Sequence, residues 1–528
     1  MHGNAGKARS THLSRRRFMA AAVGAAVAGP ALLDAPAVGQ TTARHAPPPL
    51  PEDPFTLGVA SGDPLHNGVM LWTRLAPEPT VDGGGMPPHP YRVRWEVATD
   101  ETMSRVVRRG ASPADAAHAH SVHVDVRGLR PDRPYWYRFR VGDHLSPIAR
   151  TRTAPAPYQR RLTLGFGLVG CQRYTSGYYT AYDDLAAADV DLVVHSGDYI
   201  YETGGNSVRS DPLPESITLD QYRNRHALYR TDAALQAAHA TAPWVFTWDD
   251  HEVENNYTGL VPEVGSSTPD PAAFVARRAA GYRAYWEHMP MRGPAPTGPD
   301  LRIHRRIRWG RLADFLVLDT RQFRTDQTCG TNDVGGRCDA AFDPATQVLG
   351  TEQERWLSRG LRTSTADWAV LAQQVVFSQF AFVPGNPGIY NLDQWDGYPA
   401  ARQRVLDTLA ADRPHDTVVL TGDIHASFVS DLKADYDDPA SATLGAEFVG
   451  TSISSDGSAL NAVVPLILAN NPHVRYANAQ KRGWVKHTVR PHEWRADYRL
   501  VDDVSVMGAP VSTATSWVLP RGGQLESA

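Results

Sequence analysis

The chain shows two successive patterns of hydrophobic and polar residues. From Pro54 to about Thr153, short runs of alternating apolar and polar residues are separated by turn residues about every 8–12 positions. This spacing predicts an antiparallel β-sandwich. The predicted strands lie in GVASGDP, VMLWTRL, YRVRWEVAT, HSVHVDV and YWYRFRV.

One segment of this first region indicates the type of sandwich. Leu129-Arg130-Pro131 followed by Tyr135-Trp136-Tyr137 is similar to the tyrosine corner of fibronectin-type domains. We therefore predict an Ig/fibronectin-like all-β domain over residues 52–152. The stretch TRTAPAPYQRR, residues 151–161, reads as a linker.

Beyond Leu162, nearly continuous apolar runs end in polar motifs and are followed by helical segments. The runs lie in LTLGFGLVGCQ, DLVVHSGDY, PWVFTWDDHE, LADFLVLDTRQ, WAVLAQQVVFS and TVVLTGDIHAS. We predict helices over Thr180–Ala188 and Leu219–Ala238, and β-like runs in DYRLVDDV and TSWVLPRG that complete the domain. The pattern predicts a layered α/β domain over residues 160–522, with functional groups at the ends of buried strands.

The N-terminus has the features of an export signal. Ser14-Arg15-Arg16-Arg17-Phe18-Met19 precedes a weakly apolar run from Ala20 to Leu33, and adjacent arginines indicate the twin-arginine route. About 14 residues are too few for a permanent membrane span. We predict a signal peptide over residues 1–37, a Pro-rich leader over 38–51, transient binding to the twin-arginine translocase, and a secreted product. The alternative is a basic helix start that precedes an Ala-rich helix by chance.

Charge and composition narrow the range of partners. The 528 residues carry a formal net charge of −4. Residues 1–37 hold five basic residues and one acidic residue, so the mature chain would carry −8. This acidity gives no electrostatic basis for a nucleic-acid-binding surface. An anionic substrate must instead be attracted locally, for example by bound cations.

The chain contains three cysteines. Cys329 and Cys338 lie in CGTNDVGGRC, a Gly- and Asp-rich stretch that a disulfide could close into a surface loop. That pairing leaves Cys171 single.

Four predicted strand ends carry residues that bind metals. They are Gly170-Cys171-Gln172, the run from Gly197 to Glu202, the run from Trp248 to Glu252, and the run from Gly422 to His425. Each motif alone has an ordinary explanation, since an Asp often caps a helix and a lone His is often structural. Their joint occurrence predicts a polynuclear metal site in which two cations bind a phosphate and activate water.

The ligand types divide into two sets. Thiolate, phenolate and imidazole suit a transition metal, whereas carboxylate and amide oxygens suit Ca²⁺ or Mg²⁺. The first set comprises Cys171, Tyr201 and His425, with Asp198 shared, and the second comprises Asp250 and Asp423. His251, next to a ligand, is placed to hydrogen-bond phosphate or to protonate a leaving oxygen.

The order Cys…GDxxY…DDHE…GDxH resembles the PhoD-type form of the calcineurin-like metallophosphoesterases. The surrounding GYYTAYDDL, HSGDYIYE, WDDHEVENNY, LDTRQFR and TGDIHASF fit that family over nearly the whole chain after the leader. One departure is Gly170, where a Ser is expected. The resemblance implies a β-sandwich flanked by helices that binds Fe³⁺ and one or two Ca²⁺. It places Fe³⁺ on Cys171, Asp198, Tyr201 and His425, and Ca²⁺ on Asp198, Asp250 and Asp423. Asn255 or its neighbour Asn256 is a further candidate Ca²⁺ ligand, and the alternative for both asparagines is ordinary turn formation.

The activity that the resemblance implies is that of a secreted alkaline phosphatase. Its substrates would be small or polymeric phosphate monoesters and diesters, attacked by a hydroxide or oxide held by the metals. His251 and Arg321 are the predicted catalytic residues, although Arg321 could equally support the metal ligands through a salt bridge. The alternatives are a phosphodiesterase of the phospholipase D type and a non-catalytic secreted protein that binds a cell-wall polymer.

Overall fold

The computed structural model describes residues 49–50, 52–330, 333–413 and 416–528. The predicted signal peptide and all but two residues of the predicted leader lie outside these ranges. Within them, the structure contains no helix whose length and apolar character would allow it to cross a membrane.

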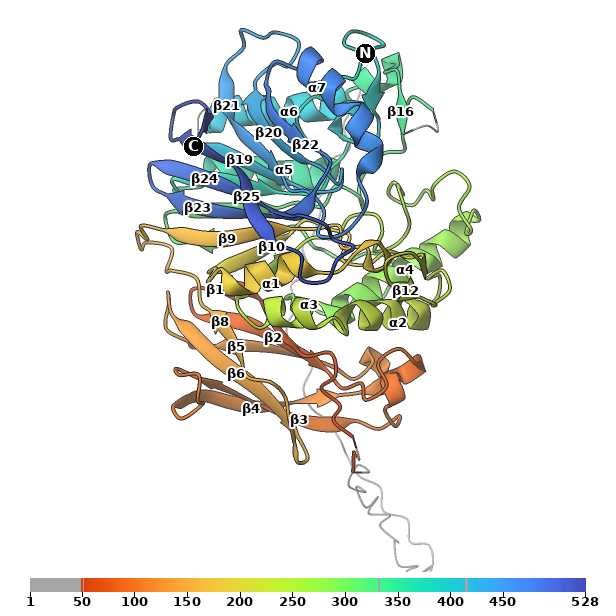
Figure 1. Cartoon of the computed structure of the whole chain (residues 1–528), viewed down its shortest axis with the longest axis vertical. Helices are drawn as coiled ribbons and strands as arrows, with labels where there is room; N and C mark the ends of the chain where they lie inside the picture. The colour runs from red at the N-terminus through yellow and green to blue at the C-terminus, as the bar shows by residue number, and fades with distance from the viewer. Residues whose placement is uncertain (1–48, 51, 331–332, 414–415) are drawn as a thin grey trace, which may run out of the picture. The chain divides into compact units, whose positions relative to one another are not determined.

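Two large sheets form the centre of the fold (Figure 1). The ten-stranded sheet has the order β26 (Glu526–Ser527), β25 (Val511–Pro520), β24 (Glu493–Val501), β23 (Arg482–Arg490), β9 (Leu164–Val169), β10 (Leu192–His195), β13 (Trp244–Phe246), β1 (Val59–Leu65), β2 (Gly68–Arg74) and β5 (Ser121–Arg127). The seven-stranded sheet has the order β14 (Arg305–Trp309), β15 (Ala313–Val317), β17 (Trp368–Ala372), β19 (Thr417–Thr421), β21 (Thr443–Val449), β20 (Ser427–Lys433) and β22 (Val474–Asn478).

The sheets pack face to face through parallel strands. β9, β10 and β13 are parallel neighbours in one sheet, and β15, β17, β19 and β21 are parallel neighbours in the other. Leu168 and Val194 of the first sheet share a core with Phe315, Val370 and Leu420 of the second. Strands buried on both faces require nearly continuous apolar sequence, which is why these strands were predictable.

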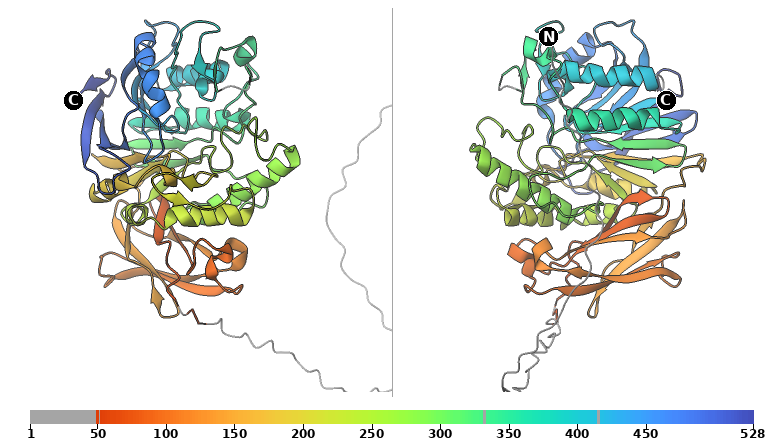
Figure 2. Two further views of the ribbon diagram at one scale, coloured as in Figure 1. Left: turned by 45° about the vertical axis from the view of Figure 1, so that its right-hand side comes forward. Right: turned by 180° about the vertical axis from the view of Figure 1, so that it is seen from behind.

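Helices cover the two outer faces (Figures 1 and 2). The ten-stranded sheet is covered by α1 (Thr180–Ala187), α2 (Leu219–Arg230), α3 (Ala233–His239) and α4 (Pro271–His288), and the seven-stranded sheet by α5 (Gly350–Arg362) and α6 (Pro399–Asp412). The short α7 (Val464–Asn470) packs near β22. This layered α/β sandwich confirms the predicted fold class.

The predicted single helix over Leu219–Ala238 is wrong. α2 ends at Arg230, and the side chain of Asp232 accepts hydrogen bonds from the backbone N–H groups of Ala234 and Leu235. An Asp in this position begins a new helix, because it satisfies N–H groups that have no partner within the helix.

The N-terminal region is all-β. β4 (Val106–Ala114), β3 (Tyr91–Ala98), β6 (Pro134–Val141) and β7 (His144–Leu145) form a sheet, with β8 (Ala149–Arg152) paired to β6. This sheet packs against β1, β2 and β5. However, β1 also pairs with β13, Gly62 opposite Trp244. One half of the N-terminal sandwich is therefore continuous with the ten-stranded sheet.

Small elements complete the described structure. β11 (Gly205–Asn206) pairs with β12 (Ser210–Asp211), and β16 (Val334–Gly335) pairs with β18 (Tyr390–Asn391). Cys329 and Cys338 form the predicted disulfide, and Cys171 is a buried free cysteine.

The predicted tyrosine corner is present at Tyr135. Its hydroxyl accepts the backbone N–H of Arg130 at 2.9 Å and lies 3.3 Å from the Arg130 carbonyl oxygen. Tyr135 is buried. The bond therefore ties the loop before β6 to the sandwich core.

We expect Tyr135→Phe to lower the free energy of unfolding by about 1–2 kcal/mol, because it leaves the N–H of Arg130 without its partner. Urea denaturation of the full chain would measure this loss. Tyr91→Phe is the matched control, since the buried Tyr91 hydroxyl has no hydrogen-bond partner among the described residues. An equal loss in both variants would contradict the assignment.

Candidate metal centre

Strand ends from both large sheets meet at the candidate site. Cys171 follows β9, Asp198 follows β10, the Asp249–Asp250 pair follows β13, and Asp423 precedes His425 after β19. Parallel strands of a sheet present their carboxyl ends at one edge, so chemical groups gather there.

Left-handed backbone geometry is a shared feature of the site. Cys171, Asp198, Asp423 and His425 have φ angles of 54°, 55°, 62° and 54°. A non-glycine residue in this region costs on the order of 1–3 kcal/mol and is held there by the surrounding structure. Such strain is concentrated at functional sites.

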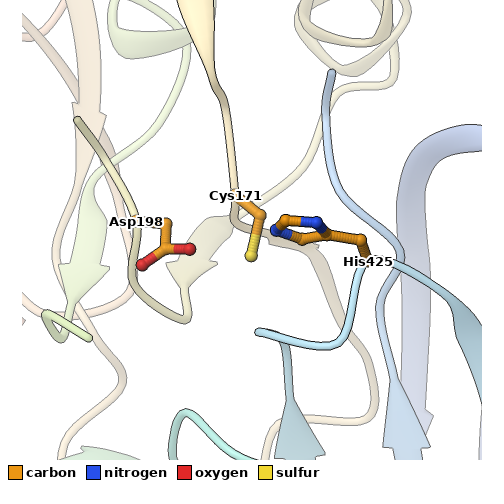
Figure 3. Close-up of side chains that lie close together, drawn as sticks. All are labelled: Cys171, Asp198 and His425. Atoms are coloured by element: carbon orange, nitrogen blue, oxygen red, sulfur yellow. The ribbon is translucent and has the colours of Figure 1, made fainter. Parts of the chain in front are cut away.

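The four residues of the first predicted set, called the soft set below, lie together. Cys171, Asp198 and His425 each place a ligand atom within 4.8 Å of the other two, and Figure 3 shows the three side chains approaching from separate loops. The Tyr201 hydroxyl joins them, 2.9 Å from Asp198 Oδ2 and 2.9 Å from His425 Nε2. The structure thus brings together all four residues of this predicted set.

His425 is oriented as a ligand. Its Nδ1 lies 2.8 Å from the carbonyl oxygen of Asp456. A carbonyl only accepts, so Nδ1 carries the hydrogen and Nε2 keeps its lone pair. Burial lowers the pKa of His425 to about 4. The ring is therefore neutral, as metal coordination requires.

The acidic groups of this set are costly to ionise without a cation. Burial raises the pKa of Cys171, Asp198 and Tyr201 well above their ordinary values, and neighbouring acidic groups raise them further. Asp198 Oδ1 is buried with no hydrogen-bond partner in the described part of the chain. An anion in such surroundings needs a positive partner. The residues therefore fit bound cations.

A second set consists of oxygen ligands. Asp249, Asp250 and Asp423 place carboxylate oxygens within 4.8 Å of one another. Ligand atoms of Asp198, Asp250 and His251 lie equally close together, with His251 offering a ring nitrogen. Asp250 belongs to both groups, and Asp198 links them to the soft set. Asp249 was not predicted as a ligand. Shared members of this kind are typical of a site for more than one cation.

Arg321 lies among these carboxylates and is fully buried. Its Nε donates to Asp249 and its Nη1 donates to Asp393 at 2.9 Å. Its Nη2 lies 3.5 Å from both Asp250 Oδ2 and Asp423 Oδ1. These contacts favour the salt-bridge role over direct binding of phosphate.

His251 and Asn255 both contact Glu202. His251 Nδ1 lies 2.7 Å from Glu202 Oε2, and the Asn255 backbone N–H donates to Glu202 Oε1 at 3.1 Å. Burial alone would lower the pKa of His251, but Glu202 and Asp250 raise it well above its ordinary value. The side-chain amide of Asn255 donates to Glu263 at 2.6 Å. The ligand role of Asn255 stays a prediction.

Glu252 is an organising residue that the sequence did not single out. Its carboxylate accepts the backbone N–H groups of Asp198, Tyr199 and Asp249 at 3.2, 2.7 and 2.8 Å. It therefore fixes two ligand-bearing loops at once. The only sequence signal was its place at the end of the DDHE motif.

The loop after β21 also contributes to the site. Ser455 Oγ lies 2.7 Å from the Cys171 carbonyl oxygen and 2.8 Å from the Tyr201 hydroxyl, and the next residue, Asp456, orients His425. This segment reads as an ordinary turn, SSDGS. No sequence signal marked it.

Ser196 explains the glycine at position 170. A Cβ on Gly170 would lie 2.5 Å from Ser196 Oγ, and a Cβ on Gly422 would also collide with that oxygen. The buried Ser196 therefore fills the space between the residues that precede Cys171 and Asp423. A serine at position 170 would need this space.

Comparisons with known proteins give matches that cover most of the chain. The family model described as PhoD-like phosphatase matches residues 166–498, and that of the PhoD-like phosphatase N-terminal domain matches residues 40–155. Alkaline phosphatase D of Bacillus subtilis (strain 168) is 49% identical over 489 residues, covering 90% of this chain and 82% of that protein. A solved structure of PhoD is 47% identical, with a TM-score of 0.87 over 91% of this chain and 93% of that one.

We expect Gly170→Ala to destabilise the protein by about 1–3 kcal/mol and to reduce bound metal, because the added methyl collides with Ser196 Oγ and displaces Cys171. Adding Ser196→Ala should recover both properties, since it removes the colliding oxygen. Unfolding experiments and elemental analysis of the two variants would measure this. If the second substitution gives no recovery, the packing explanation is wrong.

Proposed function

The chain belongs to the PhoD-like phosphatase family, and we propose that it hydrolyses phosphate monoesters and diesters at the buried centre described above. One observation supports this proposal above all. Cys171, Asp198, Tyr201 and His425 lie close together, and a set of carboxylates adjoins them. Buried, mutually repelling acids are costly without bound cations, and groups of this kind are typical of active sites.

We propose Fe³⁺ for the pocket of Cys171, Asp198, Tyr201 and His425, because thiolate, phenolate and imidazole are transition-metal ligands. One or two Ca²⁺ are proposed for Asp198, Asp250 and Asp423, with Asp249 beside them, because these ligands are all hard oxygens. Bound there, the cations would polarise a phosphate ester and lower the pKa of water.

Side chains of the protein position the metal-binding carboxylates and supply a proton to the substrate. Glu202 holds Nδ1 of His251, which leaves Nε2 to donate a hydrogen bond to a phosphate or leaving oxygen. Arg321 holds the carboxylates of Asp249 and Asp393 and keeps them beside Asp423 despite their repulsion. His251 is thus proposed to contact substrate, and Arg321 to act as a positioning residue.

The proposed place of action is outside the cytoplasm. The arginine-rich N-terminus, which lies outside the described residues, supports twin-arginine export. The Cys329–Cys338 disulfide also supports it, because such bonds persist in oxidising compartments.

We expect Cys171→Ala to lose iron and to lower hydrolysis of p-nitrophenyl phosphate by about 10³-fold or more, because a metal's charge stabilisation is worth several kcal/mol. Elemental analysis and the visible charge-transfer band would report the iron. The double variant Cys329→Ser/Cys338→Ser is the control and should keep its iron. Full iron content and activity in Cys171→Ala would exclude the proposed ligand set.

Substrate comparison separates the proposed activities. We expect hydrolysis of both p-nitrophenyl phosphate and bis(p-nitrophenyl) phosphate, with both activities lost to EGTA and restored by Ca²⁺. Hydrolysis of the diester alone would identify a phosphodiesterase of the phospholipase D type instead. No hydrolysis of either ester by metal-loaded protein would favour the binding-protein alternative.

A further inference from the structure

The N-terminal sheet carries a concentration of arginines on its outward face. Because side chains alternate along a strand, Val93 and Phe139 face the sandwich core while their neighbours face outward. The outward residues, which we call the arginine face, are Arg92, Arg94 and Glu96 of β3, Arg109 of β4, and Arg138 and Arg140 of β6. They line a hollow of about 420 Å³.

The strand register places like charges opposite one another. Arg94 is directly opposite Arg140, and like charges at such positions destabilise a sheet. Glu96 lies between Arg109 and Arg138, and among the described residues it is the one acidic side chain that lines the hollow. The cross-strand pairs of the arginine face therefore contain more positive than negative side chains.

Ion pairing within the described structure does not remove this excess. Arg138 binds Glu96 at 2.8 Å, and Arg140 reaches Asp143 at 3.7 Å. No salt bridge or side-chain hydrogen bond to Arg92, Arg94 or Arg109 occurs among the described residues. All three of these arginines are exposed.

The hollow also has an apolar part. Leu145 pairs with Arg140, shares its outward face and is 48% exposed, whereas Trp95 and Phe139 pair with each other on the core side of the sheet. A Cβ on Gly110 would collide with the Trp95 ring. Glycine therefore lets the β4 backbone lie against the indole on the core side of the sheet, behind the arginine face.

We propose that the arginine face binds a linear polyanion with repeated phosphate groups. Guanidinium groups bind phosphate through paired hydrogen bonds, and phosphates over Arg94 and Arg140 would replace their repulsion with attraction. Arginines two residues apart on β3 and on adjacent strands give a two-dimensional array, which fits a chain of charges better than a single ion. In an acidic protein, such local positive charge concentrates a polyanion on one surface.

This proposal does not depend on the proposed catalytic function. None of the residues of the arginine face belongs to the metal centre. If the chain hydrolyses polymeric phosphate esters, binding at this face would raise the polymer's local concentration without taking part in the reaction.

The test is binding of fluorescently labelled inorganic polyphosphate to the full chain, measured by anisotropy over a range of salt concentrations. The variant Arg92→Gln/Arg94→Gln/Arg109→Gln should weaken binding by about tenfold or more. By analogy with single-stranded nucleic acid, the slope of log K against log salt should fall by about 2.

The matched control is Arg308→Gln/Arg355→Gln/Arg359→Gln. It removes the same charge from exposed arginines that also have no ion pair among the described residues. Its affinity for polyphosphate should stay within about twofold of the parent chain. Equal affinities in all three proteins, or equal losses in the two variants, would overturn the proposal.

A second measurement distinguishes loss of binding from misfolding of the variant. Arg94→Gln relieves the repulsion with Arg140, so its melting temperature without polyanion should be equal to or above that of the parent chain. Long-chain polyphosphate should raise the melting temperature of the parent more than that of Arg94→Gln. An equal rise in both proteins would argue against binding at this face.

Discussion

The cost of placing many acidic groups in a buried space governs the architecture of the candidate site. Asp198, Asp249 and Asp250 are buried together with a thiol and a phenol, and the partly exposed Asp423 lies beside them. Burial and mutual repulsion raise the pKa of Asp423 to about 6, even though Arg321 opposes the shift. Such a group of acids is stable only if positive charge is held among them.

The chain supplies part of that positive charge itself. Arg321 lies within the oxygen-ligand set, and Glu202 and Asp250 favour the protonated form of His251. In the soft set the balance is different, because His425 is neutral and one buried oxygen of Asp198 has no hydrogen-bond partner among the described residues. The cationic side chains of the chain therefore balance the charge of the oxygen-ligand set more fully than that of the soft set. Bound metal cations matter most for the soft set.

The sequence predicted the parts of the site that follow directly from strand ends. Cys171, Asp198 and His425 were predictable because each comes after a continuous apolar run that must be buried on both faces. Glu252 and Ser455 were not, since their roles depend on backbone groups that only the folded chain brings near. The break between α2 and α3 was missed for a different reason: the Asp232 cap is a local signal, but the helical pattern continues on both sides of it.

The pairing of β1 with β13 connects the N-terminal sandwich to the sheet that carries the site. Gly62 allows this pairing, because a Cβ there would lie 2.4 Å from the Pro290 carbonyl oxygen and 2.8 Å from that of Trp244. β13 ends just before Asp249 and Asp250. The alternating pattern that made the N-terminal strands predictable reports which face of each strand is buried, but it carries no information about a strand's edge partner. Edge pairing depends on close backbone approach, and here one glycine makes that approach possible.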